Sequence, residues 1–202
     1  MPLHEYRKKR DFKVTSEPAG ARREAKPSRL RYVIQKHRAS HLHYDFRLEW
    51  NGVMLSWAVP KGPSLDPAIK RLAMQVEDHP IEYSDFESTI PRGEYGGGTM
   101  MIWDTGTWAP QSDDVDVATK KGELKFELCG KKLKGSWVLV RTRGYGGGKR
   151  ASWLLIKHRD EFARKGDITL EAPRSAVSNR TLEEIARDEG GAVKRAATGD
   201  PR

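Results

Sequence analysis

Three histidines and one aspartate lie within nine consecutive positions, in the segment HRASHLHYD. His43, Asp45 and Arg47 alternate with apolar residues, and side chains two positions apart on a β-strand project from the same face. His37 lies at the end of the preceding strand-like segment, one tight connection away. Two imidazoles and one carboxylate can hold a divalent cation and leave coordination positions open for water and substrate. The spacing therefore indicates a candidate open metal site.

The same alternation is also typical of the solvated face of a half-exposed sheet, so spacing alone does not establish a metal site. Further polar groups follow in the sequence. Lys61 in VPKG and Arg71 in AIKRLA are cations suited to phosphoryl oxygens. The segment VEDHPIEY adds Glu77, His79 and Tyr83. Together these residue types favour a site that acts on a phosphoester.

The composition is that of a globular chain with a basic N-terminal segment. Its 202 residues suffice for one domain with a core. The formal net charge is +9, and residues 1–32 hold 10 Lys and Arg against 4 Asp and Glu. Positive charge gathered near one end favours a nucleic-acid partner, because contacts to phosphates release condensed counterions.

Other features of the sequence exclude several classes of protein. No apolar run approaches the roughly 20 residues that span a bilayer, and the N-terminus lacks the apolar stretch of a leader. We therefore expect a cytoplasmic protein without a membrane partner. Cys129 is the single cysteine, which excludes an internal disulfide and a cysteine-based zinc site.

Short strand-like segments separated by turn signals predict a mainly all-β fold. HYDFRLEW and VMLSWAVP are joined by Asn51-Gly52, which is a strong hairpin signal. Such spacing predicts a compact antiparallel β-barrel with one or two short flanking helices, at RDEFA and TLEEIARDEG. If the apolar strand residues face outward under covering helices, the polar residues line a central cavity.

Composition also predicts how the chain is divided. We expect a basic, largely extended N-terminal arm over residues 1–28 and a barrel domain over residues 29–165. Residues 166–202 are expected to form a C-terminal tail with a short helix.

Longer motifs resemble one known family. KH-x5-HYDFRLE, SWAVPKGPS, VEDHPIEY, WDTGTW and WLLIKHRDE occur in the order found in the 3′-phosphoesterase family. Its members are the end-healing module of bacterial DNA ligase D and stand-alone homologues. The resemblance extends from about Tyr6 to Ala163. Because no polymerase or ligase part follows, the chain resembles the stand-alone form.

The resemblance implies a compact β-barrel with its site in the central cavity. It also implies a hydrolase that uses Mn²⁺ or another divalent transition metal in DNA repair by end joining. Such an enzyme removes 3′-terminal ribonucleosides and then 3′-phosphates from DNA or RNA, as phosphodiesterase and phosphomonoesterase, and leaves a 3′-hydroxyl. The implied partners are primer–template 3′ ends, a DNA ligase and an end-binding protein, and we expect a monomer.

The resemblance also implies roles for individual residues of this sequence. By motif, the metal ligands are His37, His43 and Asp45. The residues that match phosphate-binding and catalytic groups are Arg10, Asp11, Arg47, Lys61, Arg71, Glu77, His79 and Tyr83.

Two other functions remain open on the residues alone. His43 and Asp45 with a distant histidine also match the ligand pattern of non-heme iron oxygenases. A nucleic-acid-binding barrel without chemistry would use aromatic residues for base stacking and the basic arm for phosphates. The many cations suited to phosphate argue against the oxygenase. Metal-dependent turnover of a substrate with a 3′-terminal ribonucleotide would separate an enzyme from a binding module.

Overall fold

The computed structural model describes residues 3–20, 29–142 and 151–201. Within those ranges the strands are β1 (Leu30–Arg38), β2 (Leu42–Trp50), β3 (Val53–Val59), β4 (Arg71–Gln75), β5 (Ser88–Ile90), β6 (Gly98–Pro110), β7 (Glu123–Gly130), β8 (Lys134–Arg141) and β9 (Ser152–Lys157). The helices are α1 (His4–Lys8), the 3₁₀ helix η1 (Ile81–Asp85), α2 (Val115–Lys121), α3 (Ile168–Glu171), α4 (Leu182–Asp188) and α5 (Val193–Ala197). None of the described helices is long and apolar enough to cross a membrane.

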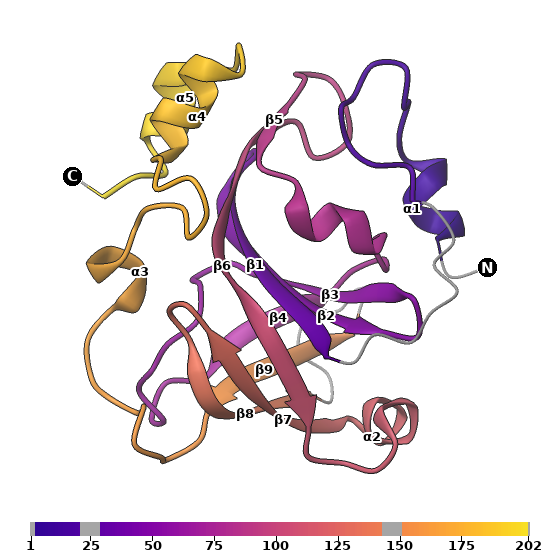
Figure 1. Ribbon diagram of the computed structural model, residues 1–202, viewed down its shortest axis with the longest axis vertical. Helices are drawn as coiled ribbons and strands as arrows, with labels where there is room; N and C mark the ends of the chain where they lie inside the picture. Colours follow the sequence, from indigo (N-terminus) through magenta and orange to yellow (C-terminus); the bar gives the residue numbers. More distant parts are fainter. Residues whose placement is uncertain (1–2, 21–28, 143–150, 202) are drawn as a thin grey trace.

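Eight of the described strands form a closed antiparallel barrel (Figure 1). Their order is β1-β2-β3-β4-β9-β8-β7-β6, and β6 pairs back with β1 to close the sheet. The short strand β5 is added to β6. The predicted mainly β, antiparallel barrel is therefore confirmed.

The hairpin between β2 and β3 forms where the Asn-Gly pair predicts it. Asn51 and Gly52 have positive φ angles of 46° and 81°, as a two-residue type I′ turn requires. Trp50 then pairs with Val53. This turn sets the register that places polar residues of β2 and β3 on a common face.

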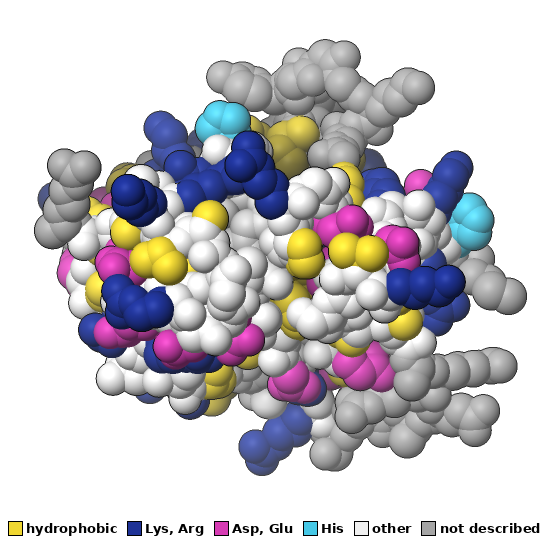
Figure 2. All heavy atoms as spheres, turned by 90° about the horizontal axis from the view of Figure 1, so that it is seen from above, with side chains coloured by type: hydrophobic (Ala, Val, Ile, Leu, Met, Phe, Trp, Pro, Cys, Tyr) yellow, Lys and Arg dark blue, Asp and Glu magenta, His cyan; other side chains and the backbone are white. Residues whose placement is uncertain are grey.

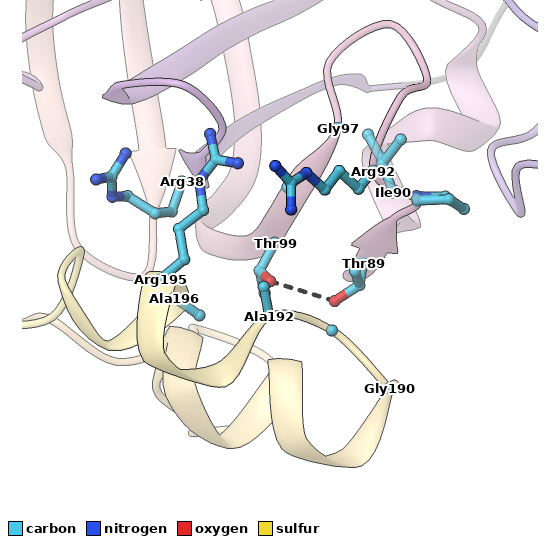
Figure 3. Close-up of a pocket in the computed structure, with 13 residues that line it drawn as sticks. Arg38, Thr89, Ile90, Arg92, Gly97, Thr99, Gly190, Ala192, Arg195 and Ala196 are labelled. Atoms are coloured by element: carbon cyan, nitrogen blue, oxygen red, sulfur yellow. Dashed lines mark hydrogen bonds between the residues drawn. The ribbon is translucent and has the colours of Figure 1, made fainter.

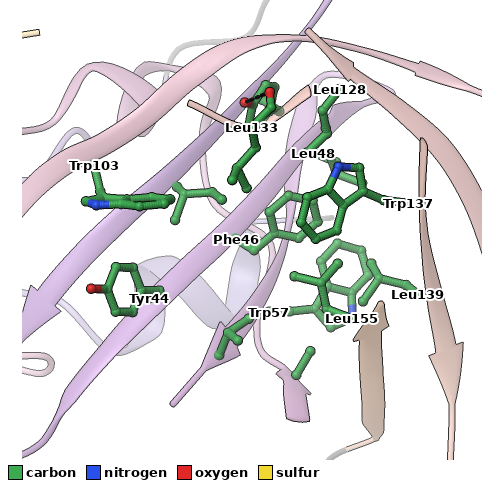
Figure 4. Close-up of a cluster of buried hydrophobic side chains, with 14 of the residues drawn as sticks. Tyr44, Phe46, Leu48, Trp57, Trp103, Leu128, Leu133, Trp137, Leu139 and Leu155 are labelled. Atoms are coloured by element: carbon green, nitrogen blue, oxygen red, sulfur yellow. Dashed lines mark hydrogen bonds between the residues drawn. The ribbon is translucent and has the colours of Figure 1, made fainter. Parts of the chain in front are cut away.

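The interior of the barrel is filled with apolar side chains (Figure 4). Phe46 of β2 stacks on Phe126 of β7 with ring centroids 5.7 Å apart, and Trp57 of β3 meets Trp153 of β9 at 6.1 Å. These strands are not neighbours in the sheet, so the contacts cross the interior. The expectation of a central cavity is therefore corrected: the apolar strand faces point inward, and the polar face of β2 lies on the outer wall.

Residues 3–20 pack against this outer wall, in contrast to the extended arm that their composition predicts. Tyr6 in α1 is 0% exposed, and its hydroxyl donates to the Pro18 carbonyl at 2.7 Å, which folds the segment back on itself. The apolar cluster around it consists of Tyr6, Tyr83, Phe86, Ile90 and Met100. One buried aromatic residue thus anchors a segment that is otherwise polar. The rest of the predicted arm, residues 21–28, lies outside the described residues.

The C-terminal segment packs on the side of β1 and β6 opposite to α1 (Figure 1). Leu182 and Ile185 of α4 and Ala196 of α5 are buried in the main apolar core. Thr181 caps α4 and forms a capping box with Glu184. The helix predicted in TLEEIARDEG is therefore confirmed, and α3 and α5 accompany it.

The helix predicted at RDEFA, residues 159–163, is wrong, because this segment forms turns. The carboxylate of Asp160 accepts hydrogen bonds from the Ser136 amide at 2.7 Å and from the Phe162 amide at 3.0 Å. It also pairs with the Lys157 ammonium group. These bonds tie the segment to β8 and β9 instead of allowing helical hydrogen bonds.

Asp104 is a buried carboxylate of β6 that supports the start of β8. It accepts hydrogen bonds from the amides of Lys132 and Leu133, both at 2.9 Å, and from the Tyr32 hydroxyl at 2.6 Å. Asp104→Ala would leave these donors unpaired in the interior. We expect the free energy of unfolding to fall by about 3 kcal/mol in urea denaturation. The exposed control Asp113→Ala should change it by less than about 0.5 kcal/mol, and an equal effect of the two variants would contradict the assignment.

Candidate active site on the outer wall of the barrel

A pocket of about 670 Å³ lies between the outer wall of the barrel, the N-terminal segment and η1. It is the place where the polar faces of β1 and β2 meet the elements that cover them. The polar side chains that line it include Arg10, His37, His43, Asp45, Arg47, Glu77, His79, Tyr83 and Tyr95. Eight of these nine come from positions that the sequence identified as candidates.

The register of the β1–β2 hairpin brings the two histidines together. His37 and His43 are directly opposite partners, and Asp45 lies two residues further along the same strand face. The ring centroids of the two histidines are 4.9 Å apart. One ligand atom from each of His37, His43 and Asp45 lies within 4.8 Å of the other two. The structure therefore forms the His-His-Asp cluster that the spacing indicates.

Hydrogen bonds and burial set this cluster in a state that fits a divalent cation. His43 Nδ1 donates to the His41 carbonyl at 3.1 Å, and this orients Nε2 toward the cluster, 3.7 Å from a carboxylate oxygen of Asp45. Burial lowers the pKa of His37, although Asp45 opposes the change. Burial alone would raise the pKa of Asp45, but Arg47 and the two histidines hold it well below its usual value. An ionised carboxylate and unprotonated imidazole nitrogens are the forms that bind metal.

Arg47 is a buried cation that links the His-His-Asp cluster to the rest of the pocket. Its Nη2 lies 3.1 Å from an Asp45 oxygen. Its Nε donates to Gln35 at 2.8 Å and its Nη1 to the Ser56 hydroxyl at 2.9 Å. The guanidinium group also lies 4.9 Å from the centre of the Tyr83 ring. These contacts fix the charge of Arg47 in one orientation beside the cluster.

His79 is held next to Arg10 with an unprotonated nitrogen. Its backbone pairs with Met54 of β3, and its Nδ1 donates to the Glu77 carbonyl at 2.8 Å. Its Nε2 therefore accepts from Arg10 Nη2 at 3.4 Å. Burial, together with the charges of Arg47 and Arg10, lowers the pKa of His79 well below its ordinary value. In the structure His79 is thus a neutral acceptor close to two cations.

Glu17 is a buried carboxylate that sequence reasoning missed. It accepts from Arg10 Nε at 2.8 Å, from the Tyr83 hydroxyl at 2.9 Å and from the Thr15 hydroxyl at 3.0 Å. Burial and the charge of Glu17 raise the pKa of Tyr83 well above its ordinary value. Arg10 also stacks over the Tyr6 ring at 3.8 Å. Glu17 gave no signal in the sequence, because it lies in a basic segment and its partner Tyr83 is distant in the chain.

Comparison with known proteins identifies the family. The profile of the DNA Ligase D 3′-phosphoesterase domain matches residues 35–141. The chain belongs to this family. The resemblance seen in the motifs is confirmed, and the matched segment of this phosphoesterase domain contains the His-His-Asp cluster, Arg47, His79 and Tyr83.

The domain is similar to part of larger proteins. It is 53% identical over 185 residues to the multifunctional non-homologous end joining protein LigD of Pseudomonas aeruginosa, covering 90% of this chain and 22% of that protein. It is also 43% identical over 142 residues to LigD of Mycobacterium tuberculosis, which is named a multifunctional non-homologous end joining DNA repair protein. This match covers 70% of this chain and 18% of that protein. The chain thus spans about a fifth of the length of these curated relatives.

Three of the predicted site residues do not line the pocket of this phosphoesterase domain. Asp11 is exposed, and its carboxylate accepts from the Lys13 amide at 3.0 Å, so it stabilises a turn. Lys61 is exposed in the loop after β3. Arg71 lies on the same face of β4 as Ala73, which belongs to the interior core. The roles implied for these three residues have no support from the pocket geometry.

Glu77 lines the pocket and pairs with cations of the N-terminal segment. It accepts from Lys9 Nζ at 3.0 Å and lies 3.6 Å from Arg10 Nη1. Glu77 therefore helps to hold Arg10 at the pocket, together with Glu17. Its charge also acts on the next residue in the chain: burial and the neighbouring Glu77 raise the pKa of Asp78 to about 6.

Proposed function

We propose that this domain is a metal-dependent 3′-end-healing phosphoesterase. It removes 3′-terminal ribonucleosides and 3′-phosphates from DNA or RNA and leaves a 3′-hydroxyl for repair by end joining. The observation that carries the proposal is one pocket that combines a His-His-Asp ligand set with two buried arginines. Membership of the phosphoesterase family and similarity to end-joining proteins support it.

His37, His43 and Asp45 would hold the cation, for which we propose Mn²⁺. A bound divalent cation supplies Lewis-acid polarisation of a phosphoryl oxygen. Arg47 uses three of its five N–H groups, on Gln35, Ser56 and Asp45. The other two would be available to the phosphoryl group. Arg47 would thus bind and orient the substrate and neutralise charge that develops in the transition state.

His79 would act on the phosphoryl group together with Arg10. In the free protein its Nε2 carries no proton, because Nδ1 donates to a carbonyl and burial, together with the charges of Arg47 and Arg10, depresses the pKa. A phosphoryl dianion placed beside Arg10 and Arg47 would offset these charges and raise the pKa of His79 again. His79 could then take up a proton at Nε2 and donate it to the leaving oxygen. Tyr83, hydrogen-bonded to Glu17, would keep Arg10 in place.

The proposal extends to partners. Because the relatives are multifunctional end-joining proteins of which this chain matches about a fifth, we propose that it works with a DNA ligase and an end-binding protein. Its substrate would be the 3′ end of a primer–template duplex. The iron oxygenase and the binding barrel without chemistry receive no support from the family assignment.

The deciding experiment uses a 5′-labelled primer–template with one 3′-terminal ribonucleotide. With Mn²⁺ we expect stepwise conversion to the 3′-phosphate and then to the 3′-hydroxyl, and no conversion with a chelator, because the ligand set is expected to require its metal. The matched control is His37→Ala, which removes one of the three ligands. Binding of the substrate without any conversion in Mn²⁺ would favour the binding barrel, and turnover of 2-oxoglutarate with iron would favour the oxygenase.

A further inference from the structure

A second, smaller pocket of about 150 Å³ lies beside the candidate active site and is bordered by three arginines (Figure 3). Arg38 ends β1, Arg92 lies between β5 and β6, and Arg195 belongs to α5. Ile90 lines both this arginine pocket and the candidate site. The two pockets therefore share a wall.

No carboxylate of the described residues neutralises the positive charge of the arginine pocket. Among the described residues, no ion pair joins any of its three arginines to a carboxylate. Arg38 donates to the carbonyls of Ala39 and Ser40 and to a threonine hydroxyl, and Arg195 donates to the Ala39 carbonyl. Arg92 is exposed. Guanidinium groups with only neutral partners are suited to an anion such as a phosphate.

Tertiary structure brings these arginines together from three distant parts of the chain. At Gly191, between α4 and α5, an added Cβ would lie 2.5 Å from the Thr89 hydroxyl oxygen, so the close approach to β5 requires glycine. Figure 3 shows Arg92 and Arg195 extending toward the pocket from opposite sides. Figure 2 shows Lys and Arg side chains, with Asp and Glu side chains among them, on the half of the surface toward the C-terminal helices.

We propose that the arginine pocket binds a backbone phosphate of the nucleic-acid strand whose 3′ end occupies the candidate active site. This inference rests on the proposed function. Arg38 directly follows the candidate ligand His37 in β1, and Arg195 contacts the β1–β2 turn, whose residues 39–41 line the candidate site. The two pockets therefore adjoin each other, as contacts to two phosphates of one strand would require. Such a contact raises affinity and does not touch the reacting atoms.

The test compares a long and a short substrate. The variants are Arg92→Gln, Arg195→Gln and the double variant, and Arg38 is left intact because it holds the β1–β2 turn. Arg159→Gln is the control, since Arg159 is exposed and borders neither pocket. For a single-stranded oligonucleotide with a 3′-phosphate, the double variant should raise KM about tenfold with unchanged kcat. For a nucleoside 3′-monophosphate, which has no second phosphate, all variants should match the parent.

The salt dependence gives an independent reading. Loss of one phosphate contact on a single strand should reduce the slope of log K against log salt by about 0.7. An unchanged KM and slope for the double variant would overturn the proposal. A loss that appears only when a complementary strand is present would overturn the assignment to the substrate strand.

Failure of the proposed function would be recognised separately. If the parent protein converts neither these substrates nor the primer–template with Mn²⁺, that function is wrong, and the arginine pocket is judged by fluorescence anisotropy with a labelled 3′-hydroxyl oligonucleotide. The double variant should then still bind about tenfold more weakly than the Arg159→Gln control. Equal affinities would reject the pocket.

Discussion

His43→Ala is expected to lose its affinity for Mn²⁺, whereas His79→Ala is expected to keep the metal and lose rate. His43 is one member of the His-His-Asp cluster, with its Nε2 3.7 Å from Asp45, so its removal leaves two of the three proposed ligands. Metal affinity should fall strongly, and excess Mn²⁺ should restore part of the turnover. His79 is not in the cluster, and its side chain contacts Arg10 and the Glu77 carbonyl.

The rate loss in His79→Ala should be about 10² to 10⁴ at saturating metal, typical of a lost proton donor or electrostatic group. Calorimetric Mn²⁺ titration and single-turnover cleavage, run on the same preparations, separate the two effects. His4→Ala is the matched control, because His4 is largely exposed on α1 and lies outside the pocket. Loss of metal in His79→Ala with retention in His43→Ala would require a different ligand set.

Glu17→Gln is expected to reduce both stability and activity, although Glu17 lies in a segment that resembles a flexible arm in sequence. The buried Arg10 would lose its closest anionic partner, at 2.8 Å, and Tyr83 would lose a charged acceptor. An unpaired buried charge lowers stability by about 3–5 kcal/mol, and Glu77, 3.6 Å from Arg10, would offset part of this. We therefore expect the free energy of unfolding to fall by about 3 kcal/mol and kcat/KM by about 10² or more.

A double variant tests this explanation. Arg10→Gln combined with Glu17→Gln removes both charges, so stability should recover relative to Glu17→Gln while activity stays low. Glu5→Gln, an exposed carboxylate on α1, should match the parent in urea denaturation and in cleavage. If Glu17→Gln behaves like Glu5→Gln, residues 3–20 are a passive tail and Arg10 does not contribute to the site.

Local patterns were sufficient to predict the β2–β3 hairpin and the two alternating faces of β2. The Asn51-Gly52 turn and the alternation around Asp45 depend on neighbouring residues only, so they can be recognised in sequence. The close spacing of His37 and His43 likewise predicted that they lie near each other, because a tight connection brings the ends of two antiparallel strands together; the structure pairs them directly. The His-His-Asp cluster was accessible to sequence reasoning for this reason.

Only the tertiary structure decided which face of β2 is interior. N-terminal residues and η1 cover the polar face, so both faces of the strand are buried. The polar–apolar alternation of β2 therefore does not by itself tell whether the polar face lines an interior cavity or a covered outer wall. The same holds for Glu17 and Tyr83, whose hydrogen bond joins residues 66 positions apart. Lys61 and Arg71 match the family motifs, yet the path of the chain leaves them outside the pocket lining. Sequence by itself determined the types and the local order of the chemical groups. Long-range packing determined which of these groups share a pocket, and sequence could not predict this because contacts between distant segments leave no local periodicity.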